Sequence, residues 1–307
     1  MIDYLLRRAQ HLLWVLLAVS LLVFLLIYLS GDPATLLAPL DAGPEDVARI
    51  KQLYGLDQPL WVQYVRFLGD AVRGDLGDSL RYKQPAFGLV LDKLPATIGL
   101  ALFALFLTVV IGIPLGIWAG VNANRVTDWV ISLFTFVGIS IPAFWLGILL
   151  ILTFADRLRW LPSSGDGSWR HLLMPGFTLA ITSIGLVSRL VRATLIEVLD
   201  QDYIRTARAK GLAARAILYR HALRNTLIPT VTVLGLQLGG LLGGSVVVES
   251  VFAWPGVGWL MLQGIQNRDL PLVRAVVLVV GLGFVLINLV VDLLYSYLDP
   301  RIRHDEA

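Results

Sequence analysis

Long uncharged stretches dominate the chain and set its predicted elements. Six of them are each about as long as a helix must be to cross roughly 30 Å of hydrocarbon. They cover residues 12–31, 94–124, 129–155, 172–188, 225–248 and 275–291. An apolar run of this length predicts a membrane-spanning helix, because hydrocarbon leaves the backbone no partner except itself. The expected fold class is therefore an all-α integral membrane protein with six transmembrane helices.

The first two runs are separated by a polar segment, residues 32–93, that has its own helical pattern. One amphipathic helix is predicted from Pro44 to Gly55, with acids in its first turn and a terminal glycine. A second follows Pro59 and ends near Gly74. We expect this segment to be an extracytoplasmic helical cap over the bundle rather than a substrate contact. The predicted division is a first part, residues 1–93, and a core of five spans, residues 94–300.

Prolines and glycines interrupt several of the apolar runs. The second and third runs contain Gly112-Ile-Pro-Leu-Gly116 and Ser140-Ile-Pro-Ala143, each of which predicts a kink. The fifth run is expected to start at Asn225 or Thr226 as a helix cap. Its glycines permit a close approach to a second transmembrane subunit or line a pore. They are Gly235, Gly239, Gly240, Gly243 and Gly244.

A basic, helix-forming segment, residues 189–228, stands between the fourth and fifth runs. Asp202 is predicted to cap a short helix over residues 203–210, and Gly211 to end it in a left-handed conformation. Tyr203 and Ala207 share one predicted face at i,i+4 spacing. Charges surround that face, so it suits docking into a groove of a partner, although charge alone favours a solvated loop.

Composition and charge agree with a membrane protein whose ends both face the cytoplasm. The chain is 57% hydrophobic and 15% charged, and it contains no cysteine. With both ends inside, the inner segments hold thirteen Lys and Arg residues and the short outer loops hold five, the bias expected of that orientation. Scattered histidines make a metal site unexpected. No lysine is followed by Ser or Thr, and no zinc or serine-hydrolase motif is present, so we expect a non-catalytic protein without a cofactor.

Two acids at the ends of apolar runs are candidates for ion pairing. Glu249 is expected to pair with Arg268, and Asp292 with Arg189, Arg192 or Arg8. Substrate or proton handling is the alternative role for an intramembrane acid. We favour the structural role for both.

An ordered set of motifs resembles the permeases of dipeptide, oligopeptide, glutathione and nickel importers of the ATP-binding-cassette (ABC) class. The motifs are Gly31-Asp-Pro33, Gly55-Leu-Asp-Gln-Pro59, Gly74-Asp-Leu-Gly77, Leu94-Pro-Ala-Thr97, Tyr203-Ile-Arg-Thr-Ala-Arg-Ala-Lys-Gly211, His221-Ala-Leu-Arg-Asn225, Phe252-Ala-Trp-Pro-Gly-Val-Gly258, Arg268-Asp269, Asp292-Leu-Leu-Tyr295 and Asp299-Pro-Arg-Ile-Arg303. The general importer signature Glu-Ala-Ala reads Arg205-Thr-Ala207 here. That departure is usual in the peptide branch, but it leaves the charge partner on the ATPase open.

The resemblance implies a type I ABC importer permease that forms half of a path for dipeptides or oligopeptides. It implies a second homologous permease subunit, two ATPase subunits that use ATP and Mg²⁺, and an extracytoplasmic solute-binding protein. The location implied is the bacterial cytoplasmic (inner) membrane. The residues implied to couple the chain to the ATPase are Asp202, Tyr203, Arg205, Thr206, Ala207, Arg208, Lys210 and Gly211.

Other functions remain open at this point. Within the family, the cargo could be glutathione, nickel or a metallophore, because the binding protein usually sets specificity. From another class, a stand-alone channel or ion-coupled carrier would work without an ATPase and would usually carry charges at the membrane midplane. Nucleic-acid binding by the basic segment is disfavoured, since it lies between two membrane spans.

Overall fold

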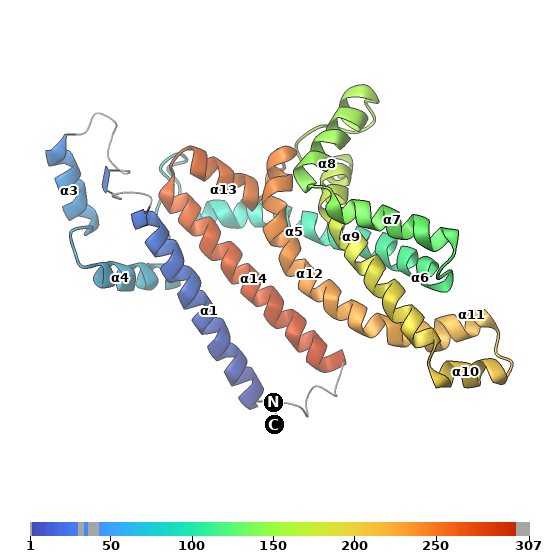
Figure 1. Cartoon of the computed structure of the whole chain (residues 1–307). Helices are drawn as coiled ribbons and strands as arrows, with labels where there is room; N and C mark the ends of the chain where they lie inside the picture. The colour runs from blue at the N-terminus through green and yellow to red at the C-terminus, as the bar shows by residue number, and fades with distance from the viewer. Residues whose placement is uncertain (1, 30–33, 36–42, 299–307) are drawn as a thin grey trace. The chain divides into compact units, whose positions relative to one another are not determined.

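The computed structural model describes residues 2–29, 34–35 and 43–298, and every regular element in these ranges is a helix (Figure 1). The chain forms two compact units. Unit 1 comprises Met1–Pro95 and Gly256–Leu286, and unit 2 comprises Ala96–Pro255 and Ile287–Ala307. The all-helical fold is confirmed. The predicted division after residue 93 stays a prediction.

Unit 1 contains α1, α3, α4, α13, the start of α5 and most of α14. Their bounds are α1 Ile2–Leu29, α3 Pro44–Tyr54, α4 Leu60–Val72, α5 Ala86–Leu107, α13 Val257–Gln266 and α14 Leu270–Leu298. The two amphipathic helices predicted after the first run are confirmed as α3 and α4. Gly55 ends α3 with a φ of 64°, a conformation that glycine adopts without a steric penalty.

The polar segment before α5 is fastened to the start of α14 by buried polar contacts. Asp269 is fully buried and accepts hydrogen bonds from the Ser79 hydroxyl at 2.5 Å and the Leu272 amide at 3.2 Å. Arg274 donates to the Leu76 carbonyl oxygen at 2.9 Å, and its guanidinium lies 4.9 Å from the ring centre of Phe67. These contacts hold the polar loop against the helices of its own unit.

Unit 2 contains the rest of α5 and α14, together with further α-helices and π-helical segments. Their bounds are η1 Thr108–Gly112, α6 Ile113–Val121, α7 Val126–Ser140, α8 Ala143–Leu150, η2 Ile151–Arg157, α9 Trp169–Leu199, α10 Asp202–Ala209, α11 Ala214–Ala216, η3 Ile217–Ala222 and α12 Leu223–Val251. Helix α9 contacts α6, α7, α8 and α12. In its most apolar 18-residue stretch, 56% of the residues are buried. It is the central helix of this unit.

Glycines bring α6 unusually close to α9. A Cβ placed on Gly116 would lie 2.6 Å from the carbonyl oxygen of Ser188, and one on Gly112 would lie 3.1 Å from that of Ile184. The two glycines are four residues apart and therefore share one helix face. The Gly112–Gly116 motif was predicted to be a kink. The structure makes it a packing face inside a 36-residue apolar helix, Ala86–Val121, and the kink stays a prediction.

Four helices are long and apolar enough to cross a membrane within the described part of the chain: Ala86–Val121, Trp169–Leu199, Ala214–Val251 and Leu270–Val291. The predicted third span is a broken pair, Val126–Ser140 and Ala143–Arg157, bent by 103°. Ile141 is extended because the proline that follows it disfavours the helical conformation at that residue. The break is far sharper than the predicted kink. In the first run, α1 includes an apolar helix over Leu13–Leu25.

The start of the fifth span also differs from the prediction. Asn225 and Thr226 lie inside a continuous helix, Ala214–Val251, so neither is a cap. Thr226 donates its hydroxyl to the Ala222 carbonyl oxygen at 3.0 Å, an arrangement that belongs to a helix interior. The span is therefore joined without a break to the basic segment before it.

Candidate functional site

The basic segment forms a short helix that leaves and rejoins the long helices of unit 2. Gln201, in an extended conformation, precedes the first turn of α10, and the Ile204 amide donates to its carbonyl oxygen at 3.0 Å. Asp202 is the first helical residue, and no side-chain hydrogen bond caps the helix, so the predicted capping role of Asp202 is wrong. Its carboxylate still lies in the first turn, where the helix dipole favours a negative charge.

Gly211 ends the helix as predicted. Its φ is 78°, in the left-handed region, and its amide donates to the Arg208 carbonyl oxygen at 2.9 Å. The Leu212 amide reaches back to the Ala207 carbonyl oxygen at 3.3 Å. These bonds satisfy carbonyls that a helix end would otherwise leave unpaired. No atom lies within 4 Å of a Cβ built on Gly211, so the backbone conformation is what requires glycine there.

The inner face of α10 packs on its own unit. Ile204 and Ala207 are buried among side chains of α9 and η3, including Leu195 and Ile217. Tyr203 is 42% exposed. The predicted shared face of Tyr203 and Ala207 is therefore wrong, because the larger apolar residue Ile204 occupies the centre of the buried face. The small residue Ala207 faces the chain itself and leaves the other side of α10 open.

A side-chain hydrogen bond joins α10 to the following long helix. The Asn225 amide donates to the Tyr203 hydroxyl at 2.8 Å. Helix α10 is thus connected to α9 by a two-residue turn, to η3 by the buried cluster and to α12 by this bond. A displacement of α10 would be transmitted to α9 and α12 together.

The predicted basic rim is largely exposed. Arg205 contacts Asp200 at 3.0 Å and Asp202 at 3.5 Å, but its side chain is 62% exposed, so this pairing adds little stability. Arg208 donates to the Leu199 carbonyl oxygen at 3.5 Å, and Lys210 is exposed. Thr206 donates its hydroxyl to the Asp202 carbonyl oxygen within the helix.

Exposed apolar side chains occur along the same segment. Tyr203 in α10 and Leu212 after it are each 42% exposed, and Tyr219 in η3 is 68% exposed. Large apolar residues at a surface with a polar rim are typical of an interaction site.

One of the arginines expected to pair with Asp292 has a different partner in the structure. Arg192 makes a two-point contact with Asp128, with nitrogen to oxygen distances of 2.5 and 2.7 Å. Arg189 is exposed, and within the described part of the chain it has no hydrogen bond or ion pair. The side chain of Asp292, proposed to pair with either arginine, lies outside the described residues.

Glu249 lies in a buried position near the end of α12. It accepts a hydrogen bond from the Thr97 hydroxyl at 2.8 Å, and both belong to unit 2. Its expected partner, Arg268, is exposed and belongs to unit 1. The pairing of Glu249 with Arg268 stays a prediction.

Sequence reasoning missed Asp128 and Thr97 as partners. Asp128 was detectable as an acid directly before an apolar run, but its partner is 64 residues away. Thr97 gives no comparable signal, because a threonine in an apolar run commonly bonds to its own helix.

Comparison with known families now identifies the chain. The sequence model of the binding-protein-dependent transport system inner membrane component family matches residues 112–304, and that of the family's N-terminal part matches residues 1–101. The chain belongs to this family. It is a multi-pass permease subunit of an ABC importer.

Relatives support the same family over the full length of the chain. The glutathione transport system permease protein GsiC of Escherichia coli K12 is 42% identical over 305 residues, 99% of this chain and 100% of the relative. GsiC of Salmonella paratyphi A matches equally well.

Solved structures support the permease fold. A chain of the inward-facing MetNI methionine ABC transporter superposes with a TM-score of 0.58 at 21% identity, covering 69% of this permease and 96% of that chain. A chain of an amino acid ABC transporter gives a TM-score of 0.53 at 18% identity, covering 70% and 94% respectively. The permease thus has the type I importer fold that its motifs implied.

Proposed function

We propose that this permease forms one half of a translocation path for short peptides. Its assembly would contain a second homologous permease subunit, two ATPase subunits and an extracytoplasmic solute-binding protein. The observation that carries the cargo class is the full-length 42% identity to permeases of glutathione transport, since glutathione is itself a tripeptide. Glutathione is therefore the second candidate cargo, beside dipeptides and oligopeptides.

In this proposal α10 receives the motion of the ATPase. Support comes from its exposed side, which carries Tyr203 and the basic residues, and from its three attachments to α9, η3 and α12. A rigid short helix with an open outer face and a fixed inner face can transmit displacement. The permease itself would be non-catalytic, with ATP and Mg²⁺ used by the partner subunits.

We further propose that both termini face the cytoplasm of a bacterial inner membrane and that residues 32–93 lie outside. The excess of Lys and Arg in the inner segments supports this orientation. Single cysteines at exposed Asp57 and Ala214 should then react with a membrane-impermeant thiol reagent from opposite faces. Reaction of both from the same face would contradict the orientation.

Cargo is tested by uptake into right-side-out membrane vesicles that contain the assembled transporter, internal ATP and the binding protein. We expect ATP-dependent accumulation of a labelled dipeptide or oligopeptide. Uptake of glutathione without dipeptide would select the second candidate. Uptake that persists without the ATPase subunits, or uptake of nickel and of neither peptide, would contradict the proposal.

A further inference from the structure

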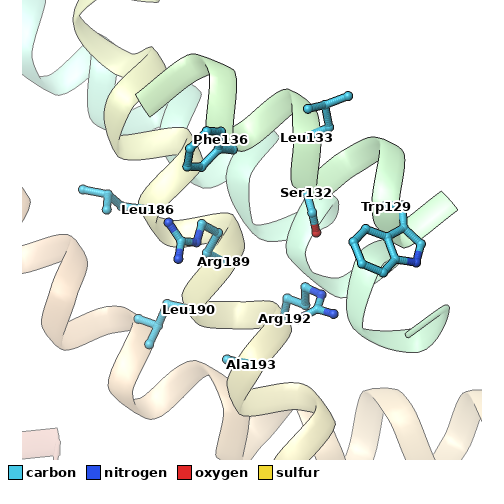
Figure 2. Close-up of a pocket in the computed structure, with 9 residues that line it drawn as sticks. All are labelled: Trp129, Ser132, Leu133, Phe136, Leu186, Arg189, Leu190, Arg192 and Ala193. Carbon is cyan, nitrogen blue, oxygen red and sulfur yellow. The ribbon is translucent and has the colours of Figure 1, made fainter. Parts of the chain in front are cut away.

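A pocket of about 690 Å³ lies between α7 and α9, within unit 2 and apart from α10 (Figure 2). Its wall is mostly apolar, with Trp129, Leu133 and Phe136 from α7 and Leu186 from α9. Figure 2 shows the two lining arginines, Arg189 and Arg192, on α9. The pocket contains no residue of α10, to which the coupling role is assigned.

The pocket carries one positive charge that the described residues leave unbalanced. Arg192 is neutralised by its two-point contact with Asp128. Arg189 is exposed and has no such partner in the described ranges, and none of the nine lining residues is acidic. The pocket therefore favours a ligand with a negative charge.

The pocket includes the ends of two apolar runs, where a membrane-spanning helix meets the lipid headgroups. Arg189 directly follows the apolar run 172–188, and Trp129 opens the run 129–155. Both lie at the ends of those runs that face the basic segment or the short turn before α7. Arginine at the end of a membrane helix extends its charge to the interface, and tryptophan is enriched at the same level.

We infer that this pocket binds the phosphate headgroup of an anionic phospholipid. The Arg189 guanidinium donates to the phosphate oxygens, a geometry that a planar guanidinium matches in a two-point contact. The acyl chains lie along α7, where Trp129, Leu133 and Phe136 are 71%, 65% and 59% exposed. These three residues follow i, i+4, i+7 spacing and so form one face of the helix.

A lipid fits these observations better than a free anion does. Soluble phosphate would use the charge of Arg189 but would leave the apolar wall uncovered, whereas a phospholipid satisfies both. The cytoplasmic leaflet is rich in anionic lipids, and basic pockets between membrane helices on that side bind such headgroups. The occupant is therefore a lipid with a net negative headgroup.

The test measures lipid retained by the full-length chain in mild detergent. Native mass spectrometry compares phosphatidylglycerol with phosphatidylcholine of the same acyl chains. We expect the wild type to prefer phosphatidylglycerol by roughly fivefold, the contribution of one basic residue near an anionic surface. Arg189→Gln should abolish the preference. Ala193→Phe, which fills the pocket without changing charge, should lower retention of phosphatidylglycerol.

Arg224→Gln is the matched control, because Arg224 is exposed on the same basic segment but does not line the pocket. It should keep the preference. Equal retention of both lipids by the wild type, or an equal loss in Arg224→Gln, would overturn the inference. Displacement of the lipid by an equal concentration of soluble glycerol phosphate would also overturn it. So would the absence of Arg189-dependent lipid from the assembled transporter, because a partner subunit would then cover the pocket.

Discussion

Gly116→Ala is expected to destabilise the permease by about 1–3 kcal/mol, the usual cost of overpacking a tight interior. The added Cβ would lie 2.6 Å from the Ser188 carbonyl oxygen and 2.7 Å from the Val191 Cβ. A backbone oxygen cannot rotate away as a side chain can, so α6 and α9 must separate. Because α9 is the central helix of its unit, that separation would also loosen α7 and α12.

Gly99→Ala is the matched control, because Gly99 lies within α5 and a Cβ added there would meet no atom within 4 Å. Alanine at this position should be neutral or stabilising by roughly 0.5–1 kcal/mol, since alanine favours a helix interior. Thermal unfolding in detergent, followed by tryptophan fluorescence, compares the two variants with the wild type. Equal unfolding temperatures for Gly116→Ala and Gly99→Ala would contradict the close packing of α6 on α9.

Much of the fold could be predicted because a membrane span is recognisable from the composition of its own residues. Apolar runs located the long helices. Proline and glycine at the ends of α3 and α4 indicated the approximate bounds of those two helices. Gly211 was predictable for the same reason, since a single residue type tolerates the conformation that it adopts. These features depend on neighbours in the sequence alone.

Features that depend on distant residues were less accessible. A proline in an apolar run is compatible with a kink or with a full break, and the local sequence does not distinguish a kink from the 103° bend found after Ser140. Pairing of Arg192 with Asp128 likewise needs the approach of α7 to α9. The orientation of α10 was mispredicted because only the tertiary structure shows that Ile204 fills the cluster between α9 and η3.

Gly211→Val is expected to cause the largest loss of transport among these variants. The residue holds a φ of 78°, and an L-amino acid in that region costs about 1–2 kcal/mol, more for a β-branched side chain. That cost corresponds to roughly a 5- to 30-fold shift between conformations. Since nothing lies near the added Cβ, the strain acts on the chain direction after α10 and not on packing. Membrane insertion should remain normal.

Three comparisons separate this effect from a general intolerance of the segment. Gly211→Asn should recover much of the lost transport, because asparagine tolerates the left-handed conformation better than other non-glycine residues. Ala213→Val places the same valine side chain at a position whose φ is −61°, so its effect on transport should be mild. Arg205→Ala should also be mild, because the Arg205 side chain is exposed.

The most direct test of coupling through α10 measures copurification of the ATPase together with ATP-dependent uptake in membrane vesicles. Gly211→Val and the wild type are compared at equal abundance in the membrane. The account predicts that Gly211→Val inserts normally but loses ATPase association, uptake or both, and that Gly211→Asn restores them in large part. Full ATPase association and full uptake in Gly211→Val would show that the conformation of this helix end does not carry the motion of the ATPase.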